Sequence, residues 1–199
     1  MPTAAILLVA GESTRMGRPK ALLPWGNTTL IEYQIRELRA APVDDLVVVL
    51  GHAAQEIRPH VPAGVRVVVN AAYREGRASS LRIGAAALPD DADPIIVLNV
   101  DQPRPREVLA KLLEAHQEGV AAVTMPVMDG KRGHPPVLAG ALLRELREAS
   151  EEMLGLRGVL ERHEGSILEV AFDSPVVRLD INTPADYERA LAELGSGSP

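Results

Sequence analysis

Short runs of consecutive apolar residues recur along the chain, and segments of helical periodicity separate them. The runs are rich in Val, Leu and Ile, so they predict strands that are buried on both faces of a mainly parallel sheet. They lie at Ala4–Ala10, Leu46–Leu50, Val65–Val69, Ile95–Val100 and Ala121–Val127, with two shorter strands predicted at Ile167–Val170 and Val176–Leu179.

The predicted helices carry apolar residues at three- and four-residue spacing. Several begin at a residue suited to capping the first turn. They are expected after the capping box that starts at Thr29, from Ser79 or Ser80 to Leu88, over Arg106–Gln117, Ala139–Arg147 and Leu156–His163, and after Thr183. This alternation predicts a three-layer α/β/α sandwich with a Rossmann-like sheet. We expect a single domain over residues 1–194 and a disordered Gly/Ser tail at 195–199.

Composition narrows the function classes. The 199 residues include no cysteine, which excludes disulfides, thiolate zinc sites and cysteine nucleophiles, and the five histidines show no metal-ligand spacing. A net charge of −6 argues against nucleic-acid or anionic-membrane partners. No stretch approaches the ~20 apolar residues of a membrane span. No basic segment precedes the first apolar run, as a signal peptide would require, so we expect a cytoplasmic protein.

The first predicted strand runs into a glycine-bearing loop that also carries cations. In "LLVAGESTRMGRPKALLPWG", Gly11 and Gly17 bracket Arg15, and Lys20 follows. Glycines let backbone N–H groups converge on an anion, while Arg15 and Lys20 supply charge for phosphate oxygens. The loop is neither a Walker A motif nor G-x-G-x-x-G. An ordinary turn with surface cations is the alternative, and the combination with Ser13 favours the anion site.

This loop resembles the L-x-A-G-x-S-x-R-M-G-x-x-K signature of the nucleotidyltransferases that complete molybdenum cofactors, and among them most closely the cytidylyltransferases. Later stretches resemble the family's further motifs in the right order, and together they cover Ala4 to about Leu191. They are "NAAYREGRASSL", "VDQP", "GHPPVL" and "LDINTPADY". The resemblance implies the fold of the nucleotide-diphospho-sugar transferases.

The resemblance also implies roles for individual residues. The catalytic residues would be Arg15, Lys20 and Asp101. The nucleotide-binding residues would be Leu8, Ala10, Gly11, Ser13, Arg15, Gly17, Lys20, Gly76 and Ser80. Gly76 and Ser80 belong to a second glycine-serine turn before a helix, where a plain helix cap is the alternative.

Asp101 follows the strand Ile95–Val100, where a carboxylate is well placed to hold Mg²⁺ against phosphates. A turn aspartate is the alternative from the residues alone, and the resemblance makes Asp101 the primary metal ligand. Asp180 would complete the metal shell, although Asn182 remains open as second ligand. Mn²⁺ is the alternative metal. His134 and Asn182 would bind the acceptor, and for His134 a structural hydrogen bond is the alternative.

The implied reaction transfers CMP from CTP to Mo-molybdopterin and releases pyrophosphate. The attacking phosphate is already largely ionised, since its second pKa is about 6, so no general base is required. Ala10 favours CTP over GTP, because guanylyltransferase relatives often carry glycine there. The alternatives are a transferase for GTP or for another phosphate acceptor, such as a sugar phosphate, and a binding protein that delivers molybdopterin. A molybdoenzyme or its chaperone is the expected partner.

Overall fold

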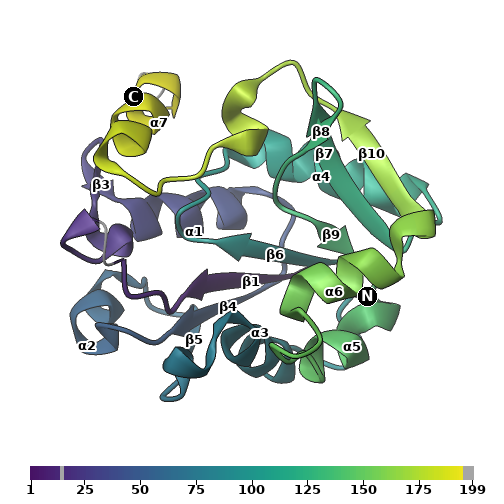
Figure 1. Ribbon diagram of the computed structural model, residues 1–199, viewed down its shortest axis with the longest axis horizontal. Helices are drawn as coiled ribbons and strands as arrows, with labels where there is room; N and C mark the ends of the chain where they lie inside the picture. The colour runs from purple at the N-terminus through teal and green to yellow at the C-terminus, as the bar shows by residue number, and fades with distance from the viewer. Residues whose placement is uncertain (14–15, 195–199) are drawn as a thin grey trace.

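An eight-stranded sheet crosses the part of the chain that this computed structural model describes, residues 1–13 and 16–194 (Figure 1). Neighbouring strands pair in parallel, except that β8 and β9 run antiparallel to their neighbours. The strand order is β10 (Ile167–Ala171), β7 (Val123–Met128), β9 (Val137–Leu138), β6 (Ile95–Asn99), β1 (Ala4–Val9), β4 (Asp45–Leu50) and β5 (Arg66–Val69), and β8 (Lys131–Arg132) pairs with β7. Strands β2 (Pro24–Trp25) and β3 (Thr28–Thr29) form a separate hairpin.

Helices cover both faces of the sheet, so the predicted three-layer α/β/α sandwich is confirmed (Figure 1). One face packs against α1 (Leu30–Ala40), α4 (Arg106–Glu118) and α7 (Pro184–Leu194), and the other against α3 (Arg77–Ala86), α5 (Leu143–Arg147) and α6 (Gly155–Arg162). Short helices complete the chain: α2 (Ala54–Ile57), η2 (Lys20–Leu22), η3 (Arg58–His60), η4 (Tyr73–Glu75), η5 (Gly140–Leu142), η6 (Glu164–Ser166) and η7 (Pro175–Arg178).

The sandwich follows from the two-residue period of the central strand. In β1, Leu7 is buried in the cluster that includes α1 and α4, whereas Ile6 is buried in the cluster that includes α3, α5 and α6. Successive side chains of a strand point to opposite faces, so a strand that is apolar throughout needs cover on both sides. Within the described residues, no helix combines the length and the apolar character needed to cross a membrane.

The capping box predicted at Thr29 is formed. The backbone N–H of Thr29 donates to Glu32 Oε2 at 2.7 Å, and α1 then buries Ile31, Ile35 and Leu38 on one face. This local pairing satisfies a backbone donor that the first turn of a helix leaves without a partner.

Two local predictions were wrong. The segment predicted as a strand at Val176–Leu179 instead lies mostly in the 3₁₀ helix η7. Pro175 suits the first turn of a helix, and Oγ of Ser174 accepts a hydrogen bond from the backbone N–H of Val176. Helix α3 begins at Arg77 after Gly76, which has φ 113°, so neither Ser79 nor Ser80 caps it; it ends at Ala86 rather than Leu88. The two-residue strands β2, β3, β8 and β9 were not predicted.

Candidate functional site

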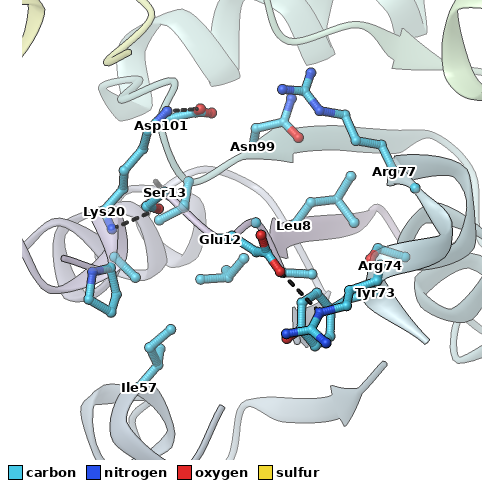
Figure 2. Close-up of a pocket in the computed structure, with 18 of the residues that line it drawn as sticks. Leu8, Glu12, Ser13, Lys20, Ile57, Tyr73, Arg74, Arg77, Asn99 and Asp101 are labelled. Atoms are coloured by element: carbon cyan, nitrogen blue, oxygen red, sulfur yellow. Dashed lines mark hydrogen bonds and ion pairs between the residues drawn. The ribbon is translucent and has the colours of Figure 1, made fainter. Parts of the chain in front are cut away.

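A cavity of about 800 Å³ opens at the carboxyl ends of β1 and β6, where open α/β sheets bind their ligands (Figure 2). Its walls come from the loop after β1, the segment from η4 into α3, and the end of β6. Of the predicted site residues, the cavity wall includes Leu8, Ala10, Gly11, Ser13, Lys20, Gly76, Ser80, Asp101 and Asn182. Gly17, His134 and Asp180 lie outside that wall, and Arg15 lies outside the described residues.

The loop after β1 is held in its turn by its own backbone. Ser13 adopts φ 54° and its carbonyl accepts from the N–H of Met16 at 2.9 Å, while Gly17 adopts φ 68°. The hydroxyl oxygen of Ser13 also accepts from the backbone N–H of Lys20 at 3.1 Å. A Cβ atom at Gly11 would have no atom within 4 Å, so this glycine leaves open space in the cavity wall. The loop therefore offers room for a ligand beside a fixed lysine.

Lys20 joins three separate segments of the chain. Its ammonium nitrogen lies 2.7 Å from Oδ2 of Asp101, which follows β6 (Figure 2). The same nitrogen lies 3.3 Å from Oδ1 of Asn182, just before α7. The side chains of Lys20 and Asp101 are 12% and 20% exposed, so solvent and a ligand still reach the pair. An ammonium group carries three donors, so Lys20 is placed to bind a phosphate oxygen while it keeps one of these partners.

His134 and Asp180 lie near the Asp101 side of the site. Burial lowers the pKa of His134, and the negative charges of Asp180 and Asp101 oppose that effect. Burial raises the pKa of Asp180, a hydrogen bond from Gln102 lowers it, and the charge of Asp101 raises it further. Two carboxylates that repel each other in this way are suited to share a cation.

Asp101 and Asp180 are the candidate ligands of a divalent metal. Among the described residues, no group of three His, Cys, Asp or Glu side chains is arranged to hold an ion alone. Mg²⁺ is usually bound by one or two carboxylates that are completed by substrate phosphates and water. Asp101 and Asp180 fit that pattern, and the amide oxygen of Asn182 contacts Lys20. The residues therefore fit a metal that two carboxylates hold and whose shell water or a substrate phosphate completes.

Several cavity residues were not predicted. Asn99, the last residue of β6, donates to Gln102 Oε1 at 3.0 Å, and Arg77 extends across the cavity toward it (Figure 2). Glu12 and Arg74 form an ion pair at 3.1 Å between two walls of the cavity. Asn99 had a usable signal, because it is a polar residue at the carboxyl end of an apolar strand. The Glu12–Arg74 pair joins residues that lie 62 positions apart, so no local sequence signal indicated it.

The sheet is open, and a glycine-bearing loop and a lysine–aspartate pair lie at its strand ends. This combination is typical of nucleotide-binding α/β proteins. Comparison with known proteins then gives the family. The chain belongs to the family described as the MobA-like NTP transferase domain, whose sequence profile matches residues 5–167.

Two curated relatives illustrate the range of this family. The bifunctional protein GlmU of Corynebacterium aurimucosum is 33% identical over 207 residues, which cover 96% of this chain and 41% of GlmU. The chain thus spans less than half the length of that relative. Nicotine blue oxidoreductase of Paenarthrobacter nicotinovorans is 34% identical over 146 residues, which cover 69% of this chain and 71% of that protein.

Solved structures confirm the fold. Rv0371c of Mycobacterium tuberculosis H37Rv superposes with a TM-score of 0.83 at 30% identity, covering 96% of this chain and 98% of that one. Its complex with manganese superposes with a TM-score of 0.79 at 29% identity and covers 96% and 98%. The molybdopterin-guanine dinucleotide biosynthesis protein A of Archaeoglobus fulgidus, at 20% identity and a TM-score of 0.70, covers 94% and 96% and shows the fold alone.

Proposed function

We propose that the chain transfers CMP from CTP to Mo-molybdopterin, forming molybdopterin cytosine dinucleotide and releasing pyrophosphate. The observation that carries the proposal is the pairing of Lys20 with Asp101 at 2.7 Å, beside the glycine-bearing loop and inside the large cavity. The acceptor phosphate oxygen attacks the α-phosphorus of CTP, and the bond to the pyrophosphate oxygen breaks. Since that nucleophile is already ionised, the residues need only position the anions and offset their charge.

Each part of the cavity has a proposed task. Lys20 and the backbone N–H groups near Gly11 stabilise the triphosphate, with Arg15 and Gly17 assigned to the same loop by resemblance. Leu8, Ala10, Gly76, Ser13 and Ser80 hold the nucleoside and its phosphates, and His134 and Asn182 hold the acceptor. When Mg²⁺ or Mn²⁺ is bound, held by Asp101 and Asp180, it would supply positive charge against the phosphates. The manganese complex of Rv0371c supports a divalent ion in this fold.

A preference for CTP over GTP is proposed from the packing behind Ala10. Ala10 is only 8% exposed, and a Cβ atom on Gly51 behind it would lie 2.7 Å from the Cβ of Ala10. Gly51 thus leaves the space that the methyl group of Ala10 occupies, and Ala10 borders the cavity. A larger purine base meets this methyl group, whereas the smaller cytosine fits beside it.

The protein is proposed to act in the cytoplasm as a single nucleotidyltransferase domain over residues 1–194. It would pass its product to a molybdoenzyme or to that enzyme's chaperone. Neither nucleic acid nor a membrane is proposed as a partner, in keeping with the net charge of −6.

The relatives make the choice of substrate the first thing to test. Pyrophosphate release should be measured with CTP and with GTP, each against Mo-molybdopterin and against a sugar phosphate. We expect turnover with CTP and Mo-molybdopterin. Turnover of a sugar phosphate with none of molybdopterin would overturn the acceptor assignment, and a preference for GTP would overturn the base assignment.

A second experiment separates an enzyme from a delivery protein. Lys20→Ala should still bind CTP, because the cavity walls remain, but it should lose about 10²–10³-fold in turnover, the cost of removing one group that stabilises transition-state charge. Lys111→Ala is the control, because Lys111 donates to the carbonyl of Ala171 in the edge strand β10 and lies outside the cavity wall. Undiminished turnover in Lys20→Ala would contradict the proposed role of the lysine.

A further inference from the structure

Arg104 is a fully buried cation in the loop that follows β6, and the proposed reaction does not use it. Its side chain is 0% exposed. The guanidinium donates to His134 O at 2.8 Å, Leu179 O at 3.1 Å and Val177 O at 3.0 Å, and also to the carbonyl of Pro103. All four acceptors are backbone carbonyls.

A buried charge is costly unless hydrogen bonds surround it, so this arrangement needs a reason. Burial lowers the pKa of Arg104 to about 10, and the negative charges of Asp180 and Asp101 oppose that effect. The group therefore remains a cation at neutral pH. Its charge acts on Asp180 as well, since it helps to lower the pKa of that carboxyl.

The three segments that meet at Arg104 each carry one residue of the proposed metal and acceptor sites. Asp101 lies in the loop of Arg104 itself, His134 follows β8, and Asp180 follows η7. Arg104 is the point where these segments meet, although its partners lie 30, 73 and 75 residues away in sequence. Two backbone hydrogen bonds tighten the same junction: His134 N to Val177 O, and Ile181 N to Asp101 O, both at 2.8 Å.

We propose that Arg104 is a positioning residue that sets the separation of the Asp101 and Asp180 carboxylates, and thereby the affinity of this site for a divalent cation. The inference rests on the proposed function in taking these two carboxylates as the metal ligands. Arginine suits the task because its planar fork reaches several carbonyls in fixed directions, whereas the compact ammonium of lysine does not.

The sign of one measurement separates positioning from simple electrostatics. If Arg104 acted only as a nearby positive charge, its removal would tighten the binding of a cation. If Arg104 positions the carboxylates, its removal weakens cation binding, even though the removal also takes away a positive charge that repels the cation. Titration with Mn²⁺ alone, followed by electron paramagnetic resonance without nucleotide or acceptor, reads this sign directly.

We expect Arg104→Met to bind Mn²⁺ at least 10-fold more weakly than the unaltered protein, and Arg104→Lys to fall between the two. Asp101→Asn should lose the same Mn²⁺ signal, which assigns that signal to this site. Arg132→Met is the matched control, because Arg132 is a surface arginine paired with Glu164 and Glu169, and its removal should leave Mn²⁺ binding unchanged.

Unchanged or tighter Mn²⁺ binding by folded Arg104→Met would overturn the proposal, as would an unaltered protein that binds no Mn²⁺. If circular dichroism shows Arg104→Met to be unfolded, Arg104→Lys decides, and affinity equal to that of the unaltered protein overturns the proposal. Because neither CTP nor acceptor is present, failure here leaves the transfer assay standing. Likewise, a failed transfer assay leaves this comparison of metal affinities valid.

Discussion

At the scale of single residues, Gly133 shows how closely two loops of the acceptor side approach. A Cβ atom at this position would lie 2.1 Å from the carbonyl oxygen of Val177, which is backbone and has little freedom to move. Gly133→Ala should therefore destabilise the protein by about 1–3 kcal/mol, the usual cost of forcing an extra methyl group into packed structure. Urea unfolding at neutral pH measures the change.

Gly165→Ala is the control for that substitution, because a Cβ atom there would meet nothing within 4 Å. It should change the free energy of unfolding by less than about 0.5 kcal/mol, as surface substitutions usually do. Equal stability losses in the two variants would show that the approach of Val177 is not the cause.

At the scale of elements, the N-terminus of α3 depends on a residue from a distant connection. Glu151, between α5 and α6, accepts from the backbone N–H of Ala78 at 2.6 Å, and its carboxyl group packs against Gly76. A carboxylate at this end of a helix satisfies a free donor and complements the helix dipole. The same turn supplies Gly76 and Ser80 to the cavity wall.

Glu151→Ala should lower the free energy of unfolding by about 1 kcal/mol, as loss of a capping group typically does. It should also weaken nucleotide binding several-fold, because the wall that carries Gly76 loses its support. Isothermal titration with CTP measures the second effect. Glu148→Ala, which breaks an exposed i,i+4 pair with Arg144, is the control and should leave CTP affinity unchanged; a matching loss there would contradict the role of Glu151.

At the scale of the whole molecule, a buried histidine makes stability depend on pH. His116 on α4 is 7% exposed and shares a 2.9 Å hydrogen bond with Thr124 on β7. Burial lowers its pKa, and the charge of Asp93 opposes this only in part. The unfolded chain therefore takes up a proton as the pH falls below about 6.5, while the folded state resists it, so stability decreases toward acid pH.

Urea midpoints at pH 7.5, 6.5 and 5.5 test this linkage. The midpoint of the unaltered protein should fall over this range, and that of His116→Gln should fall less, since glutamine does not titrate. Identical falls in both proteins would exclude His116 as a source of the pH dependence.

The spacing of apolar residues predicted most of the fold, because it indicates which faces of each strand or helix are buried. Parallel strands at Ala4–Val9 and Ile95–Asn99 and the helix after Thr29 were all found close to their predicted bounds. The errors arose at turns, where one residue decides the geometry. Pro175 begins a 3₁₀ helix in place of a strand, and the positive φ of Gly76 starts α3 earlier than the serines suggested.

Local sequence patterns were sufficient to predict the element types, the mainly parallel sheet and the residues of the first loop, because periodicity and glycine placement act over a few neighbours. Which side chains meet follows only from the folded arrangement of the layers. Lys20 contacts Asp101 and Asn182 across 81 and 162 residues, and Arg104 is buried where its sequence context, Pro103-Arg104-Pro105, indicates only a turn. Such contacts depend on how the layers pack. Packing brings together segments that are distant in sequence, and the local sequence of one segment does not indicate which other segment it will contact.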